Sequence, residues 1–92
     1  MYTILQYSYD QAKRLKVKIR PSYIRSYKID VFDMIDNYIT SVGNKNYSDY
    51  PHYIKSDGVE YANKRRNLYK LRHKKDRVKI GSRGYFADQI LW

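Results

Sequence analysis

Two short segments in the first half of the chain alternate apolar and polar residues. Residues 27–32 read YKIDVF, and residues 38–42 read YITSV. A period of two places alternate side chains on one face of a β-strand. The intervening DMIDN has the length of a hairpin connection. The pattern therefore predicts a β-hairpin, with residues 2–7 as a candidate third strand.

Helix signals lie on both sides of this hairpin. Ser8 and Gln11 have the spacing of a capping box, which predicts a short helix over residues 9–16. The longest helix is expected over residues 58–75, because Asp57 is available as its cap. An acid in its first turn and lysines in its last turn suit the helix dipole.

The remaining segments are expected to be a loop and a short final element. Residues 43–58 are dense in Gly, Asn, Ser, Asp and Pro, which predicts an ordered loop. The sequence GSRG at residues 81–84 predicts a turn, followed by a short helix or an extended tail over residues 85–92. The apolar ending ILW must pack against another part of the protein.

These elements predict a single small α+β domain spanning residues 1–92. A chain of this length buries only about two thirds of its unfolded surface, which is too little for two cores. We expect a β-hairpin of two or three strands packed against the long basic helix, with short helices near both termini. The Leu-Trp end is expected to fill the cleft between the hairpin and the helix.

The charge of the chain narrows the class of partner. The net charge is +10, and residues 55–83 alone hold eleven Lys or Arg against three acids. This asymmetry favours a polyanion: nucleic acid first, and an anionic membrane surface or an acidic protein second. No segment approaches the roughly 20 apolar residues of a membrane span. With no cysteine, disulfides and thiolate metal sites are excluded, and the protein is expected to stay inside the cell.

A helical wheel of residues 59–75 separates an apolar face from a basic face. Tyr61, Ala62, Leu68 and Tyr69 fall in one sector, and the outer sector is basic. Cations one helical turn apart can follow a row of phosphates. The residues expected to contact phosphate, on this stripe and in the segment after it, are Arg66, Lys70, Lys74, Lys75, Arg77, Lys79 and Arg83.

A second group of basic and aromatic residues is expected to hold the fold together. Arg65 and Arg72 fall among the tyrosines, where a guanidinium group stacks on a ring or pairs with a carboxylate. The carboxylates considered as partners are Asp30, Asp33, Asp49 and Asp57. His73 lies at the edge of this sector. The tyrosines that would either pack in the fold or stack on unpaired bases are Tyr47, Tyr50, Tyr53 and Tyr69.

Nothing in the sequence predicts catalysis. Asp30, Asp33 and Asp36 recur every three residues, but a strand and its turn would scatter them, so no metal site is expected. His73 beside Arg72 is the one candidate general base, for a nuclease, and a structural or phosphate-binding role is favoured over it. We expect a non-enzymatic protein without a cofactor.

The chain from about residue 28 resembles a small family of uncharacterised proteins of large DNA viruses that infect algae and amoebae. The matching positions are Gly43, Tyr47, Asp49, Tyr50, Arg65, Arg66, Tyr69, Arg72, His73, Gly84, Tyr85, Leu91 and Trp92. The first 27 residues lie outside the match, and DMIDN stands where many relatives have a glycine in the turn.

This resemblance implies a viral origin but no activity. It places the protein in the infected host cell and suggests a small basic virion protein between capsid and genome, binding DNA or RNA with little sequence preference. The alternative is a minor capsid component that contacts other capsid proteins through tyrosine-rich surfaces.

Overall fold

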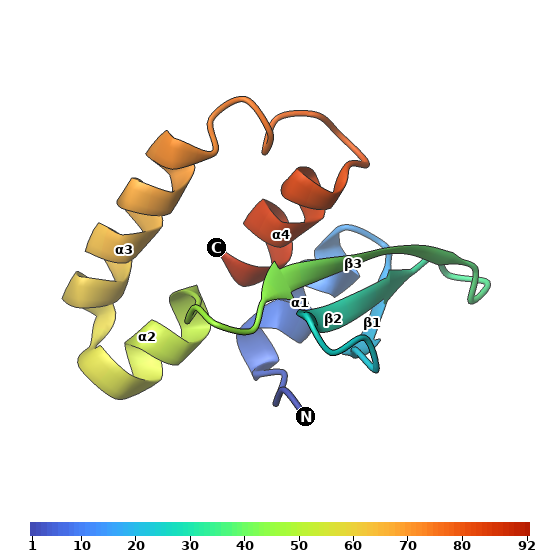
Figure 1. Ribbon diagram of the computed structural model, residues 1–92, viewed down its shortest axis with the longest axis horizontal. Coiled ribbons are helices and arrows are strands. Elements are labelled where there is room, and N and C mark those ends of the chain that lie inside the picture. The colour runs from blue at the N-terminus through green and yellow to red at the C-terminus, as the bar shows by residue number, and fades with distance from the viewer.

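A three-stranded antiparallel sheet lies beside four helices in the computed structural model, which describes residues 1–92 (Figure 1). The strands are β1 (Lys18–Pro21), β2 (Tyr27–Phe32) and β3 (Tyr38–Asn44), in the order β1-β2-β3. The predicted α+β class is confirmed, and so is the hairpin formed by β2 and β3.

The third strand is β1 and not residues 2–7, so that part of the prediction was wrong. Residues 2–5 have no regular structure, whereas β1 pairs with β2 and places Ile19 opposite Val31. Ile19 is buried, while Lys18 and Arg20 on either side of it are exposed. An alternation this short is enough for a strand at the edge of a sheet. The basic residues around it made the pattern hard to recognise in the sequence.

Helix α1 (Gln6–Arg14) begins earlier than the capping box predicted. Leu5 occupies the cap position without a side-chain hydrogen bond, and Ser8 lies inside the helix. The Ser8 hydroxyl instead donates to the Ile90 carbonyl over 2.9 Å, in a buried contact. The Ser8 side chain, which the capping-box motif predicted as a helix cap, therefore makes a tertiary hydrogen bond instead.

Helix α2 (Tyr50–Asp57) lies where a loop was predicted. The Asp49 carboxylate caps it by accepting a hydrogen bond from the His52 N–H over 3.2 Å, and Pro51 occupies its first turn. A proline in the first turn of a helix costs no hydrogen bond. Asp49 and Pro51 thus mark the start of a helix, although the composition of the segment resembles that of a loop.

The two remaining helices follow in sequence. Helix α3 (Val59–Arg72) is separated from α2 by Gly58, which has a φ of 89° that glycine adopts without strain. Helix α3 ends three residues before the predicted end. Helix α4 (Arg83–Leu91) resolves the choice between a helix and a tail, and the Ser82 hydroxyl caps it. None of the four helices has the length and apolar character that crossing a membrane requires.

The core lies between the sheet and helices α1 and α4. Its members are the buried residues Ala12, Ile19, Ile29, Val31, Val42, Phe86, Ile90 and Leu91. Helix α3 packs mainly against α2, and Tyr69 on α3 stacks on Trp92 at the end of α4. The Leu-Trp end thus lies between the sheet and the long helix, with Leu91 in the core and Trp92 beside α3. The hairpin packs on α4, where the sequence predicted the long helix.

Candidate nucleic-acid interface

The inner face of α3 differs from the face that the helical wheel predicted. Ala62 and Tyr69 are buried and Arg66 and Lys70 are half-buried, whereas Leu68 is 48% exposed. The helix has therefore turned two of its expected outer cations toward the protein and an expected inner leucine toward solvent. Its packing partners are tyrosines and a buried carboxylate, which pair better with cations than with leucine.

Arg66 is committed to the fold. Its guanidinium carbon lies 3.4 Å from the centre of the Tyr50 ring, and one terminal nitrogen donates to the Tyr7 hydroxyl over 3.2 Å. Arg65 likewise lies over the Tyr53 ring, at 5.5 Å, so its expected structural role is supported by stacking on a ring instead of pairing with a carboxylate.

Lys70 is also engaged within the protein. Its ammonium donates to the Asp88 carboxylate over 2.7 Å, and that carboxylate is completely buried. Arg77 donates from Nε to the Lys70 carbonyl over 3.2 Å and so closes the end of α3. Arg66, Lys70 and Arg77 therefore hold the fold together, although the sequence assigned them to phosphate contacts.

The other predicted phosphate contacts remain open to solvent. Lys74, Lys75 and Lys79 are exposed and form no ion pair or side-chain hydrogen bond. Arg83 is exposed too, and it donates only from Nε, to the Ser41 carbonyl over 3.0 Å. Arg72, expected to stack on a ring or to pair with a carboxylate, is exposed and has neither partner, so that expectation was wrong.

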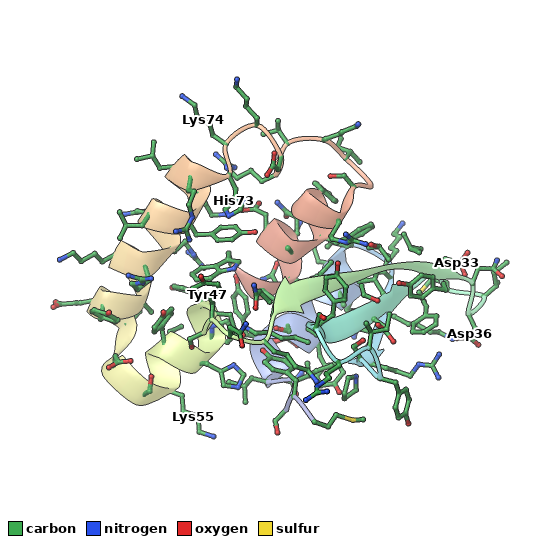
Figure 2. All side chains as sticks on the ribbon, viewed as in Figure 1. Asp33, Asp36, Tyr47, Lys55, His73 and Lys74 are labelled. Carbon is green, nitrogen blue, oxygen red and sulfur yellow. The ribbon has the colours of Figure 1, made fainter.

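A cleft of about 1230 Å³ brings several of these cations together. It lies between the loop at residues 44–48, the C-terminal end of α3 and the first turn of α4. Figure 2 shows Tyr47 and His73 in the space between α3 and the sheet. The Lys and Arg residues that line the cleft are Arg25, Lys28, Lys45, Arg72, Lys79 and Arg83, against one acid, Asp76. The cleft is therefore strongly basic.

Two of the cleft cations come from segments that the sequence did not single out. Arg25 precedes β2, and Lys45 follows β3. Because β2 and β3 are antiparallel neighbours, the start of one strand and the end of the other lie at the same edge of the sheet. The one signal available in the sequence was the absence of an acid beside either residue.

Aromatic rings form the wall of the cleft on the α3 side. Tyr69 lies between His73 and Trp92, with ring centres 4.4 Å away on each side. Burial raises the pKa of Tyr69 to about 12, with a further contribution from the carboxylates of Asp88 and Asp76. Nδ1 of His73 lies 3.3 Å from the Asp76 carboxylate. The three-ring stack joins α3 to the end of α4.

The predicted stacking tyrosines differ in how open they are. Tyr50 is buried beneath Arg66 and donates to Asn63 over 2.8 Å. Tyr53 is half-buried, with its ring against those of Tyr61 and Trp92. Tyr47 is 67% exposed and lines the cleft. Of the three, Tyr47 offers an open ring face.

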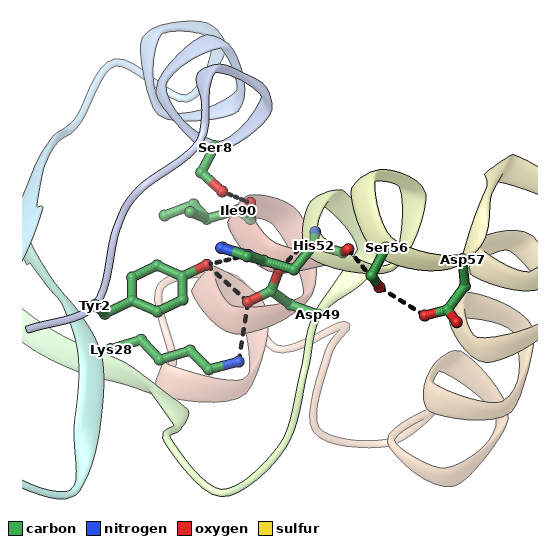
Figure 3. A network of polar contacts seen from close by, with 8 residues as sticks. All are labelled: Tyr2, Ser8, Lys28, Asp49, His52, Ser56, Asp57 and Ile90. Atoms are coloured by element: carbon green, nitrogen blue, oxygen red, sulfur yellow. Dashed lines mark hydrogen bonds and ion pairs between the residues drawn. The ribbon is translucent and has the colours of Figure 1, made fainter.

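A polar network centred on the buried Asp49 carboxylate adjoins the cleft through Lys28, and Figure 3 shows its contacts. The Asp49 carboxylate accepts hydrogen bonds from the Tyr2 hydroxyl over 2.7 Å and from the Lys28 ammonium over 2.9 Å. His52 Nδ1 lies 2.8 Å from the same carboxylate. These contacts tie the N-terminal segment, β2 and α2 together, and the sequence had not assigned any role to Tyr2 or Lys28.

The charge state of this network follows from its partners. Burial alone would oppose ionisation of Asp49, but the Lys28 ammonium and the hydrogen bonds from Tyr2 and His52 outweigh it and lower its pKa. Burial and the Asp49 charge together raise the pKa of Tyr2. The Asp49 carboxylate is hydrogen-bonded to these neighbours and is 1% exposed, so the network stabilises the fold.

Comparisons with known proteins give no further assignment. No protein-family model, characterised protein or solved structure matches the chain. Within the structure, no three His, Asp or Glu side chains are grouped closely enough to hold a metal ion together.

Proposed function

We propose that this chain is a small basic protein that binds nucleic acid through phosphate contacts in the cleft, without catalysing a reaction. The observation that supports this most directly is the set of unpaired cations in the cleft. Arg25, Lys45, Arg72 and Lys79 form no ion pair and no side-chain hydrogen bond within the protein. Cations gathered in one cleft repel each other, and phosphates relieve that repulsion.

Contacts of this kind carry no sequence information. Lys and Arg neutralise phosphates irrespective of the bases attached to them, so binding is expected with little sequence preference. Lys74 and Lys75, exposed in the segment just after α3, extend the positive surface beyond the cleft. The first turn of α4, which Ser82 caps on the cleft wall, adds backbone N–H groups that favour an anion.

Fluorescence anisotropy with labelled DNA and RNA over a salt series tests the proposal. Each neutralised phosphate contributes about −0.9 to the log–log slope on duplex DNA and about −0.7 on a single strand. The double variant Arg72→Ala, Lys79→Ala is expected to bind more weakly and with a shallower slope. Lys55→Ala, which removes an exposed cation of α2 outside the cleft (Figure 2), is the matched control.

Two results would contradict the proposal. If the protein does not bind at low salt, or if its affinity does not change with salt, it does not bind through phosphate contacts. Cleavage of the probe that is lost in His73→Ala would replace the non-enzymatic role with a nuclease using the His73 and Asp76 pair.

The proposed setting is the virion, between capsid and genome, in an infected host cell. This part rests on the sequence resemblance and on the positive charge. Mass spectrometry of purified particles, before and after nuclease treatment of opened particles, tests it. A protein released together with the genome fits the proposal, and one that remains with the shell fits a capsid role.

The capsid role is the second candidate, and exposed aliphatic residues support it. Leu71, Val78 and Ile80 are 68%, 62% and 84% exposed at the end of α3 and in the segment that follows. Side chains of this kind gain from contact with another protein. If they form the main contact, Leu71→Ser with Ile80→Ser will lower the copy number in particles, while the cleft variants will not.

A further inference from the structure

Aromatic rings and unpaired cations line the same cleft. The stacked rings of His73, Tyr69 and Trp92 face it together with Arg72 and Lys79. Phosphate binding alone requires only cations, and a duplex presents only phosphates, sugars and groove edges to a protein. Tyr69 is buried between its two neighbours, so on this aromatic and basic surface a base can stack only on a ring whose face is open.

Tyr47 is the open ring of this surface. Its side chain is 67% exposed on the opposite wall of the cleft, and no other ring or cation stacks on it. The Tyr27 ring, also in the cleft, differs because the Arg83 guanidinium lies 4.9 Å from its centre. The backbone N–H of Tyr47 donates to the Asn44 carbonyl over 3.2 Å, which holds the loop that carries the ring.

We infer that the cleft binds single-stranded nucleic acid, DNA or RNA, with an unpaired base stacked on Tyr47 and with phosphates held by the cations around it. This inference rests on the proposed function and specifies its ligand. Base faces are open in a single strand and are hidden inside a duplex, so only a single strand can stack a base on the Tyr47 ring. Stacking on a ring is possible for every base, which agrees with little sequence preference.

The geometry also provides an internal reporter. Trp92 is the only tryptophan of the chain, and it lies on the cleft wall, stacked on Tyr69. A strand that enters the cleft changes the surroundings of this indole, whereas a strand bound only to the outer lysines leaves them unchanged. Tryptophan fluorescence therefore separates occupation of the cleft from binding elsewhere on the basic surface.

The test compares short labelled oligo(dT), oligo(rU) and an oligo(dT)·oligo(dA) duplex at one salt concentration. We expect both single strands to bind at least about tenfold more tightly than the duplex and to alter Trp92 fluorescence. Tyr47→Ala should weaken binding of the single strands by about tenfold and leave duplex binding unchanged. Tyr47→Phe, which keeps the ring, should bind like the parent protein.

Tyr23→Ala is the matched control, because Tyr23 is 87% exposed and lies outside the cleft. Equal effects of Tyr47→Ala and Tyr23→Ala, or equal binding of single strands and duplex, would overturn the single-strand inference. Salt-dependent binding would persist in that case, and the proposed function would stand. If the parent protein binds none of the three probes at low salt, both the single-strand inference and the proposed function are overturned. Circular dichroism and thermal unfolding show whether each variant keeps its fold.

Discussion

The Lys28 ammonium donates to the Asp49 carboxylate over 2.9 Å, and the two side chains are only 5% and 1% exposed. The pair joins the middle of the sheet to the cap of α2. Because α3 follows directly after α2, this contact also sets where the α3 wall of the cleft stands. The geometry of a candidate binding site therefore depends on a buried salt bridge whose cation is already paired within the fold.

Lys28→Met is expected to lower the free energy of unfolding by about 3–5 kcal/mol, because it leaves the Asp49 charge buried without its cation. Urea denaturation measures the loss. Lys18→Met is the matched control, since Lys18 and Asp36 form an exposed pair at 3.1 Å that is worth about 1 kcal/mol or less. Equal midpoints for the two variants would show that the buried pair stabilises no more than the exposed one.

The same carboxylate makes stability depend on acid. The pKa of Asp49 is lower in the folded protein than in the unfolded chain, so its stabilising contribution is present above about pH 4 and is lost as the pH falls through the folded pKa. Urea unfolding between about pH 5 and pH 3 measures this loss.

Asp49→Asn provides the comparison for this acid dependence. The fall in unfolding free energy with acid should be shallower in that variant. It should not vanish, because the pKa of Asp33 is also lowered, chiefly by a hydrogen bond from the Asn37 backbone. An unchanged acid dependence in Asp49→Asn would contradict the assigned role of Asp49.

Gly43 and Gly58 both have positive φ, at 84° and 89°, but their surroundings differ. A Cβ at residue 43 would lie 2.7 Å from Leu91 Cδ1, whereas nothing lies within 4 Å of one at residue 58. Gly58→Ala should cost about 1–3 kcal/mol from backbone strain. Gly43→Ala should cost at least about 1 kcal/mol more, because overpacking adds to the strain. Thermal unfolding of the two variants side by side measures the difference.

Lys70 and Lys79 should separate stability from affinity. Lys70→Ala leaves the buried Asp88 without its cation, so we expect a loss of roughly 3 kcal/mol in unfolding free energy. Lys79→Ala should change stability by less than about 0.5 kcal/mol. It should also reduce the salt slope of nucleic-acid binding by about 0.7–0.9. Loss of stability in Lys79→Ala would contradict the assignment of Lys79 to the cleft surface.

The hairpin and the long helix follow from local chemistry, so the sequence predicted them closely, whereas it left open whether the last segment is a helix or a tail. Strand alternation acts between residues two apart, and a helix cap acts within one turn. The error at α2 was of another kind, since Asp49 and Pro51 carried the signal and the loop-like composition around them obscured it.

The inner face of α3 could not be predicted from a helical wheel, which assumes that a helix packs against apolar groups. Here the partners are Tyr50, Tyr7 and the buried Asp88 carboxylate. They come from α1, α2 and α4 and favour Arg66 and Lys70 over leucine. Which residues face inward was therefore a property of the partners and not of the helix.

The excess of positive charge, the α+β class and the approximate positions of the hairpin and the long helix are thus contained in the order of the residues, because they depend on composition and short-range periodicity. The cleft depends on packing. Arg25 and Lys45 flank β2 and β3, and they meet Arg72 and Lys79 only when the sheet and α3 are in place. Contacts between residues distant in the chain leave no local pattern in the sequence. Only the folded structure therefore shows which cations are paired within the protein and which are open to a partner.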